Sequence, residues 1–339
     1  MKFTTRVIGR TDLVVPTLGF GGAPLGGLFD QVDDTEALAT VAEALNAGLN
    51  YVDTAPFYGF GRSERRVGDM LRGHDYVLST KVGRLMRPGA LADPGALGWP
   101  DALPFHPEYN YTYDGILRSF EDSLQRLGLD RIDILYVHDI GAMTHGAAND
   151  GHFADLINGG YRALDELRRA GRVTAIGLGV NEAEVCSAAL DHGDWDVFLL
   201  AGRYTLLEQD PLDGLLPQCS ARGVSIVVGG PFNSGILVGG QTWNYSRAPE
   251  HILARVKRLA AVCDQFDVPL AAAALQFPLG HACVSSVIPG LRNRAELADT
   301  LRWAAHDIPD DLWATLVRDG LLHSAAPIPK SNPFHKRSQ

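Results

Sequence analysis

The stretch Tyr51-Val-Asp53-Thr-Ala-Pro-Phe-Tyr58-Gly-Phe-Gly-Arg-Ser63-Glu64 runs from apolar residues into a loop and then into a helical pattern. The apolar run ends in the carboxylate of Asp53, and a loop rich in Pro and Gly carries Tyr58. Ser63 has the residue type of a helix N-cap. Strand, loop and helix in this order place functional groups at the open end of an α/β sheet. On this stretch alone, a structural Asp and a packing Tyr explain the residues equally well.

The alternation of strand and helix continues along the chain. Eight apolar runs are expected as strands, each followed by a helical pattern: 17–20, 49–53, 76–81, 132–138, 173–176, 197–200, 224–228 and 284–288. Eight such units are the number found in a closed (β/α)8 TIM barrel. The alternative is an open doubly wound sheet, whose Gly-x-Gly-x-x-Gly fingerprint is interrupted here by Gly22 and Pro24. We therefore expect an α/β fold of the TIM-barrel type.

Other segments complete this expected barrel. Residues 5–9 and 13–18 predict an N-terminal β-hairpin, and a first helix is expected from Asp33 to Gly48. Further helices are expected at 64–72, 114–127, 156–170, 182–192, 212–222, across 249–277 with a break near Pro269, and from about Asn293. Long loops at 83–112 and 139–155 are expected to shape a pocket at the C-terminal face of the barrel.

Composition narrows the class of protein. The net charge is −10 and no long basic stretch occurs, so a nucleic-acid partner is not expected. No apolar run is long enough to span a membrane, and the four cysteines are scattered as in a cytoplasmic protein. We expect one domain over 1–329 and a flexible tail over 330–339. We also expect that the protein acts on a small-molecule substrate and that it is a monomer or a weak homo-oligomer.

Charged side chains stand at the carboxyl ends of three expected strands. Asp53, Lys81 and His138 hold these places, and Tyr58 lies just beyond the first of them. A solvated Lys and a hydrogen-bonded core His are the ordinary explanations, but in a barrel these ends share one face. Asp53 would then pair with Lys81, whose ammonium would lower the pKa of Tyr58. His138 would donate a hydrogen bond to a substrate oxygen, and Tyr58 would act as acid or base.

This set of residues resembles the catalytic tetrad of the aldo-keto reductases. The resemblance rests on Asp53-x4-Tyr58, Lys81 and His138, and on two longer segments, 48–59 and 119–133. It implies hydride transfer to or from a nicotinamide cofactor at the barrel mouth, with Tyr58 as acid or base. A divalent-metal site at His138, Asp139, His145 and His152 is the alternative, but their spacing is not a recognised ligand pattern and no metal is expected.

The same resemblance implies a set of cofactor-binding residues. They are Gly22, Asn181, Gly229, Gly230, Pro231, Phe232, Ser234, Gly235, Leu237, Pro289, Gly290, Arg292, Arg294, Glu296 and Asp299. An ordinary Gly-rich turn and a helix N-cap at Asn181 are the structural alternatives. The chain departs from the family where an aromatic residue, a Ser and a Gln are usual, because Gly229, Val180 and Ala201 stand there. The nicotinamide end of the cofactor must therefore be held differently.

The segment from Pro289 to Asp299 bears on the choice of coenzyme. By resemblance, Gly290 and Glu296 replace the Lys and Arg that meet a 2′-phosphate. A carboxylate accepts hydrogen bonds from ribose hydroxyls and repels a phosphate, although Arg292 and Arg294 could still meet one. We therefore expect NAD as the preferred cofactor and NADP as the second.

Within the family, the chain is most similar to the aldose 1-dehydrogenases and to the pyridoxal 4-dehydrogenases. The residues that carry this likeness include 109–115, 177–182, 200–209 and 230–237. The resemblance implies oxidation of a D-threo-aldose such as L-fucose at C1 to its lactone, which we place first. Oxidation of pyridoxal to 4-pyridoxolactone with NAD is the second candidate. The third is a nucleotide-binding regulatory barrel with little turnover, against which the intact tetrad argues.

Overall fold

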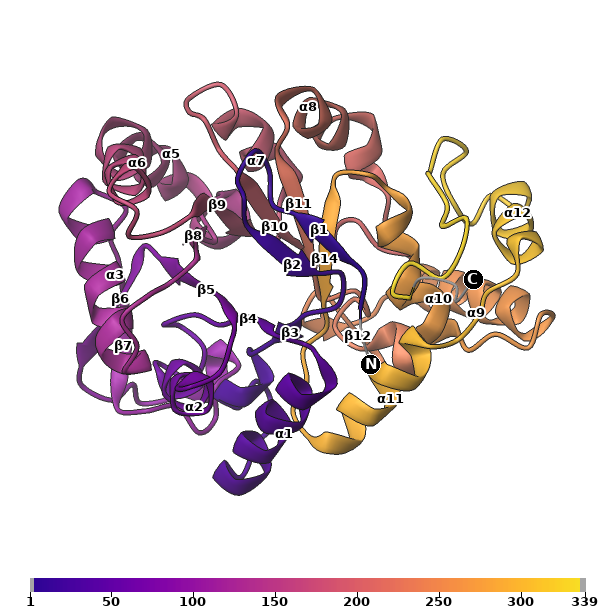
Figure 1. The fold of residues 1–339 in the computed structure, drawn as a ribbon, viewed down its shortest axis with the longest axis horizontal. Coiled ribbons are helices and arrows are strands. Elements are labelled where there is room, and N and C mark those ends of the chain that lie inside the picture. Colours follow the sequence, from indigo (N-terminus) through magenta and orange to yellow (C-terminus); the bar gives the residue numbers. More distant parts are fainter. Residues whose placement is uncertain (1–2, 336–339) are drawn as a thin grey trace.

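Eight parallel strands form one sheet in the computed structural model, which describes residues 3–335 (Figure 1). The order along the sheet is β14-β11-β10-β9-β8-β5-β4-β3. Parallel bridges join Leu18 to Val287 and Gly21 to Gly290, so the two edge strands also meet. The sheet therefore closes on itself, and the predicted (β/α)8 barrel is confirmed.

The barrel strands are short and lie close to the expected positions. They are β3 Phe20–Gly21, β4 Tyr51–Asp53, β5 Val77–Val82, β8 Ile134–His138, β9 Ala175–Val180, β10 Val197–Ala201, β11 Ser225–Gly229 and β14 Val284–Ile288. The helices are α1 Asp34–Ala47, α2 Arg62–Leu71, α3 Tyr113–Leu127, α4 Ala142–His145, α5 Asn149–Asp155, α6 Tyr161–Arg169, α7 Ala183–Ala189, α8 Leu215–Arg222, α9 Glu250–Asp264, α10 Leu270–Gln276, α11 Arg294–Ala304 and α12 Asp310–Arg318. Among residues 3–335, none of these helices is both long and apolar enough to cross a membrane.

Two helix starts show where local signals hold and where they fail. The side chain of Asp33 accepts hydrogen bonds from two amides of the first turn of α1, as an N-cap does. The expected N-cap at Ser63 is wrong, because α2 begins at Arg62, two residues before the expected start, with Gly61 at the N-cap position. Ser63 is fully buried and its Oγ donates to the oxygen of Gly22 at 2.7 Å. Its hydroxyl therefore ties the loop after β4 to the loop after β3.

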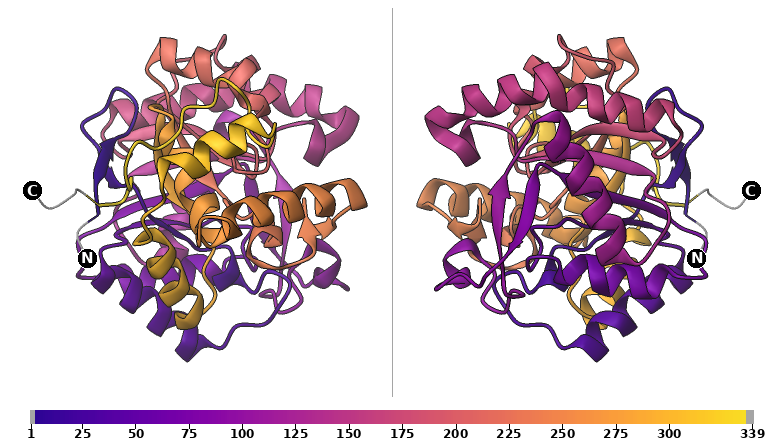
Figure 2. Two further views of the ribbon diagram at one scale, coloured as in Figure 1. Left: turned by 90° about the vertical axis from the view of Figure 1, so that its right-hand side faces the viewer. Right: turned by 90° about the vertical axis from the view of Figure 1, so that its left-hand side faces the viewer.

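The N-terminal hairpin closes one end of the barrel. Strands β1 (Thr5–Val7) and β2 (Val14–Pro16) pair in antiparallel register, as predicted. The hairpin crosses the barrel strands in Figure 1, and in the side views of Figure 2 it lies on the side away from α9. Ile8 and Val15 are fully buried with the inward side chains of the barrel. This apolar plug leaves the opposite, C-terminal end of the strands for a site.

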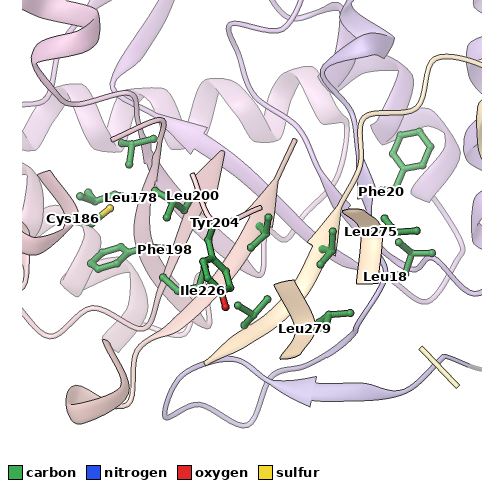
Figure 3. Close-up of a cluster of buried hydrophobic side chains, with 14 of the residues drawn as sticks. Leu18, Phe20, Leu178, Cys186, Phe198, Leu200, Tyr204, Ile226, Leu275 and Leu279 are labelled. Carbon is green, nitrogen blue, oxygen red and sulfur yellow. The ribbon is translucent and has the colours of Figure 1, made fainter. Parts of the chain in front are cut away.

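A second apolar layer lies between the strands and the surrounding helices. Figure 3 shows part of it, where Leu178 and Phe198 of the strands lie near Cys186 of α7. All of these side chains are fully buried. The layer holds the strands in a fixed frame, so the side chains at their carboxyl ends have fixed relative positions.

Segments predicted as loops contain regular structure. Residues 83–112 include the antiparallel pair β6 (Arg84–Pro88) and β7 (Phe105–Tyr109), and 139–155 include α4 and α5. A third short pair, β12 (Thr242–Trp243) and β13 (Ser246–Arg247), lies where no strand was predicted. Pro and Gly interrupt the alternation of apolar and polar residues in these segments, so the strands could not be recognised from the sequence. Tertiary contacts stabilise the paired segments.

The predicted tail is wrong at its start. Phe334 is fully buried against Phe3, and its carbonyl accepts a hydrogen bond from the amide of Thr4. Asn332 donates to the carbonyl of Ala304. The chain therefore stays packed on the barrel beyond Lys330, because Phe334 finds an apolar site. Residues 336–339 of the expected tail lie outside the described residues.

Candidate active site

The carboxyl ends of β4 and β5 bring Asp53 and Lys81 into contact. Their Oδ2 and Nζ atoms are 2.6 Å apart, and both side chains are almost fully buried. Lys81 also donates to the carbonyl of Thr54 at 2.9 Å, and Ser79 donates to Asp53 at 2.7 Å. Gly179 on β9 leaves room for this arrangement, since a Cβ there would meet Cε of Lys81 at 3.2 Å. The expected ion pair is therefore present and hydrogen-bonded.

Tyr58 lies beside this pair in the loop after β4. Nζ of Lys81 is 4.7 Å from the centre of the Tyr58 ring. Desolvation, and then the charges of Asp53 and Asp139, raise the pKa of Tyr58 well above its ordinary value, while Arg84 lowers it. The expected lowering of this pKa by Lys81 is wrong for the free protein, because desolvation and the charges of Asp53 and Asp139 outweigh the neighbouring cations. Tyr58 is thus held as a neutral phenol.

His138 closes the group from the end of β8. Its ring centre is 5.7 Å from that of Tyr58, with the planes nearly perpendicular. Burial and the nearby charges of Arg84 and Lys81 lower the pKa of His138 well below its ordinary value. The imidazole is therefore neutral, which suits a hydrogen-bond donor better than a proton store. The barrel brings all four predicted side chains to one place.

A second ion pair lies next to the first and was not among the expected site residues. Nη2 of Arg84 is 2.6 Å from Oδ2 of Asp139, and the Arg84 side chain is 3% exposed. Arg84 comes two residues after β5, and Asp139 directly follows His138. Their closeness in sequence to Lys81 and His138 could have indicated that they belong to the site. Arg84 was missed because an Arg in a segment expected to be a loop is normally exposed.

A long groove runs from Tyr58 across the ends of β9, β10, β11 and β14. Its lining includes these sequence-predicted residues: Asn181, Gly229, Gly230, Pro231, Phe232, Ser234, Gly235, Gly290, Arg292, Glu296 and Asp299. The other predicted cofactor residues, Gly22, Leu237, Pro289 and Arg294, do not line it. Gly22 and Leu237 are buried behind the wall. We propose that these four residues contact the cofactor only through their backbone or support the residues that do.

The middle of the groove has the features of a phosphate-binding loop. Asn233, Ser234 and Gly235 all have positive φ and form a tight turn, in which the amides of Asn233 and Gly235 donate to the carbonyls of Gly230 and Phe232. Asn233 is buried, and its Oδ1 has no hydrogen-bond partner among residues 3–335. Gly229 presents no side chain to the groove, where a Cβ would meet Leu199 at 3.0 Å. Bare backbone at Gly229 and Gly230, and a lining that extends from Tyr58 to Arg292, fit a dinucleotide cofactor.

The far end of the groove carries charges that already have partners. Arg292 contacts Asp30 at 2.9 Å and Glu296 at 2.8 Å. Arg294 contacts Glu36 at 3.0 Å, so both guanidinium groups are paired with carboxylates. The Glu36 carboxylate of α1 accepts hydrogen bonds from both the amide and the guanidinium of Arg294. A 2′-phosphate here would compete with these carboxylates.

The unpredicted hairpin β12–β13 places Tyr245 beside the reacting end of the groove. Tyr245 lines both the groove and the pocket next to Tyr58, and Nδ2 of Asn181 is 3.5 Å from its hydroxyl. The hairpin is anchored by Arg203, which donates to Asn244 at 2.8 Å. Nothing in the local sequence marked Tyr245, because only the folded barrel brings residues 242–247 over the mouth.

The pocket beside Tyr58 has mainly apolar and aromatic walls. Its lining includes Leu28, Phe29, Phe57, Leu97, Trp99, Leu199 and Tyr245. Tyr58, Lys81, His138, Asp139 and Asn181 are its main polar members. The ring of Trp99 lies 5.7 Å from that of Tyr58 at a shallow angle of 33°. A flat ring of modest size could lie against these aromatic walls, with its polar atoms at Tyr58 and His138.

Two histidines of the metal alternative, His145 and His152, do not line this pocket. Nε2 of His145 is 2.8 Å from the hydroxyl of Tyr111, and the ring of His152 stacks on His145 at 4.5 Å. The hydroxyl of Tyr111 in turn donates to the carbonyl of His138. The part of the chain that the structure describes contains no group of three or more His, Cys, Asp or Glu that could hold a metal ion. These histidines support the backbone of the site.

Comparisons with known proteins cover almost the whole chain. A model of the aldo/keto reductase family matches residues 17–318. Pyridoxal 4-dehydrogenase of Microbacterium luteolum is 46% identical over 333 residues, which are 94% of this chain and 97% of that protein. D-threo-aldose 1-dehydrogenase of a Pseudomonas species is 39% identical over 337 residues, 95% and 99% of the two chains. The solved holo form of aldo-keto reductase AKR11C1 from Bacillus halodurans has a TM-score of 0.73 at 26% identity, covering 98% and 99%.

Proposed function

Since this chain belongs to the aldo/keto reductase family, we propose that it oxidises a cyclic hemiacetal to the corresponding lactone. The coarser activity is that of an oxidoreductase that acts on CH–OH groups with a nicotinamide cofactor. The observation that carries the finer proposal is the position of Tyr58, which lines both the long groove and the apolar pocket. A cofactor in the groove and a substrate in the pocket would meet beside its hydroxyl.

The residues of this chain supply the proton chemistry of the reaction. For the oxidation Tyr58 must first lose its own proton to solvent; as the phenolate it then takes the proton of the hemiacetal hydroxyl while the C–O bond becomes the carbonyl of the lactone, and it returns to the neutral phenol. When bound, the oxidised nicotinamide accepts the hydride that leaves the same carbon. The proton and the hydride together account for the two hydrogen atoms that the substrate loses. His138 donates a hydrogen bond to the oxygen that gains carbonyl character, and the Lys81–Asp53 pair holds a positive charge next to the phenol.

Two hemiacetals are candidates, and the pocket favours one of them. Pyridoxal and the aldoses both present a ring with a hydroxyl on the carbon that becomes the lactone carbonyl. An aldose also carries several further hydroxyls that need hydrogen-bond partners, and the pocket offers few beyond Asp139 and Asn181. The aromatic walls suit a pyridine ring, and pyridoxal 4-dehydrogenase of Microbacterium luteolum is 46% identical. We therefore place pyridoxal before the aldoses, which reverses the order that the sequence suggested.

NAD is the cofactor that we propose for this reaction. Glu296 lines the far end of the groove, and its carboxylate suits ribose hydroxyls but repels a 2′-phosphate. Arg292 would have to leave Asp30 and Glu296 before it could bind such a phosphate. NADP is therefore the weaker alternative.

Formation of the reduced cofactor on a substrate panel tests this proposal. The panel holds pyridoxal, L-fucose, L-galactose and D-arabinose, each with NAD and with NADP. We expect the highest kcat/KM with pyridoxal and NAD, and lactone as the product by mass spectrometry. Turnover of the sugars alone would move the substrate to the aldose candidate. Absence of turnover on the whole panel, with a dinucleotide still bound, would contradict the hemiacetal proposal.

A further inference from the structure

The candidate site contains two neighbouring ion pairs, one fully buried between β4 and β5 and one that joins the buried Arg84 to the partly buried Asp139 after β8. Lys81 lies on β5 and Arg84 begins β6 two residues later, while Asp139 directly follows His138 on β8. The Arg84–Asp139 distance, 2.6 Å, equals that of the Lys81–Asp53 pair. The proposed reaction assigns no role to Arg84 or Asp139, although removing two charges from water is costly.

Arg84 is held rigidly before any substrate binds. Its guanidinium carbon lies 4.1 Å from the ring centre of Phe57 and 5.4 Å from that of Tyr109. The planar group is therefore stacked between two aromatic rings, which fixes its direction toward Asp139. Because its side chain is only 3% exposed, the charge that it directs at Asp139 is weakly screened by solvent.

The backbone of Asp139 is bent so that its carboxylate stays at the site. Its φ is +43°, a left-handed conformation that few residues other than Gly adopt. The amide of Asp139 donates to the carbonyl of Gly179 at 2.9 Å, which ties this turn to β9. Such strain is kept where the surrounding structure requires it, and often at functional sites. In this conformation Oδ2 of Asp139 lies 3.4 Å from Nε2 of His138.

Two observations select the same tautomer of His138. A neutral imidazole carries its proton on one nitrogen only, and a nearby carboxylate favours N–H on the nitrogen that faces it. Nε2 faces Asp139, whereas Nδ1 is buried with no hydrogen-bond partner among the described residues. A buried N–H without an acceptor costs free energy, so a proton on Nδ1 is also disfavoured there. Both arguments place the proton on Nε2.

We propose that Asp139, held in place by Arg84, is a positioning residue that keeps the proton on Nε2 of His138 and directs this N–H toward the substrate pocket. Asp139 itself lines that pocket, so a substrate oxygen would lie near both groups. At 3.4 Å the contact with Asp139 is longer than a good hydrogen bond, which leaves the N–H able to turn to a substrate oxygen. This inference rests on the proposed function, because it requires a substrate oxygen at His138.

The pair also affects Tyr58, in opposite directions for its two members. Asp139 raises the pKa of Tyr58 and Arg84 lowers it. The charged or titratable groups around His138 and Tyr58 are Asp53, Lys81, Arg84, Tyr111, Asp139 and Tyr245. Removing the charge of Asp139 should therefore move the Tyr58 titration to lower pH, and removing that of Arg84 should move it to higher pH. These opposite shifts follow from the two charges alone, so they test where the pair lies relative to Tyr58, whereas the tautomer of His138 tests the positioning role.

The decisive measurement is the tautomer of His138, read by NMR of protein labelled with nitrogen-15 in its histidines. The signal is assigned from its loss in His138→Gln. We expect N–H on Nε2 in the wild type and loss of this preference in Asp139→Asn. In the same variant, kcat of the oxidation should fall about tenfold or more, while the affinity for NADH stays within about twofold. Arg87→Met, which breaks the exposed Arg87–Glu108 pair on the same hairpin, is the matched control and should change neither.

Clear outcomes would overturn this inference. A proton on Nδ1 in the wild type would do so without any variant, even if Asp139→Asn did not fold. An unchanged tautomer together with an unchanged kcat in Asp139→Asn would do so as well. Failure of the proposed function is a separate result, because the tautomer is measured without substrate.

Discussion

At the end of the groove beside Tyr58 the charged side chains of Lys81 and Asp53 are buried, whereas those at the end beside Glu296 are partly exposed. Lys81 and Asp53 are at most 4% exposed, but Arg292 and Glu296 are 43% and 37% exposed. A buried charge interacts strongly with its neighbours and is costly to leave unpaired, while an exposed one is screened. The end beside Tyr58 is therefore suited to holding reactive groups in one arrangement. The end beside Glu296 is suited to distinguishing between related cofactors such as NAD and NADP.

Removal of the Tyr58 hydroxyl should have the largest effect at the buried end. In Tyr58→Phe the ring remains but no group takes the hydroxyl proton, so kcat should fall by roughly 10²- to 10⁴-fold. Cofactor affinity, measured by titration of protein fluorescence, should not change. Tyr76→Phe, at the start of β5 and away from the groove, is the control and should keep full activity. A kcat within about threefold of wild type in Tyr58→Phe would contradict the acid–base role.

Removal of the Lys81 charge should damage both activity and stability. Lys81→Met leaves Asp53 buried without its cation, which should cost about 3–5 kcal/mol of unfolding free energy in urea titrations. The double variant Lys81→Met/Asp53→Asn should lose less stability than the sum of the two single variants, because it leaves no unpaired charge. By contrast, Arg118→Met breaks an exposed pair with Asp122 and should cost less than about 1 kcal/mol. Equal losses in the Lys81 and Arg118 variants would remove the distinction between buried and exposed charge.

A substitution at the exposed end should change the cofactor preference and leave the chemistry intact. Glu296→Gln removes a negative charge beside the proposed 2′-position and frees Arg292 from one of its two carboxylates. The ratio of kcat/KM for NADP to that for NAD should rise about five- to tenfold, with kcat for NAD unchanged. Asp310→Asn, at the start of α12, provides a control of the same charge change. An unaltered ratio would show that Glu296 does not select the cofactor.

The smallest effect concerns His145, which supports the buried end from outside. Burial, followed by the charges of His152 and Arg84, lowers the pKa of His145 from 6.5 to about 4. Because the unfolded chain then binds the proton more tightly, the native state should lose stability as the pH falls from 6.5 toward 4. His145 is partly exposed, so the loss after solvent screening should be on the order of 1 kcal/mol. Urea titrations at several pH values should show a flatter dependence for His145→Gln than for wild type.

The convergence of Asp53, Tyr58, Lys81 and His138 could be predicted from the sequence, because each stands at or just after the end of an expected strand. Asp53, Lys81 and His138 all end apolar runs, and parallel strands bring such ends to one rim whatever the details of packing. The Gly-rich loop after β11 was readable for a similar reason, since only certain residues tolerate positive φ and a close backbone approach. The α1 N-cap at Asp33 depends on its own first turn alone.

Contacts between segments that are distant in the sequence could not be predicted from local patterns. Tyr245 reaches the site because Arg203 anchors its hairpin from another part of the chain, and Phe334 is buried because Phe3 lies beside it. The direction of the pKa shift of Tyr58 could not be predicted from the sequence for the same reason. One neighbouring cation predicts a lowering, but desolvation and two carboxylates produce a rise.

By itself the sequence determined the barrel, the four residues at its mouth and the line of the cofactor groove, because these follow from local periodicity and from residue types at strand ends. Only the tertiary structure decided which charges are buried together, where the Arg84–Asp139 pair lies and how apolar the pocket is. These properties depend on how distant segments exclude water and on the low dielectric that results, and no local pattern along the chain contains that information.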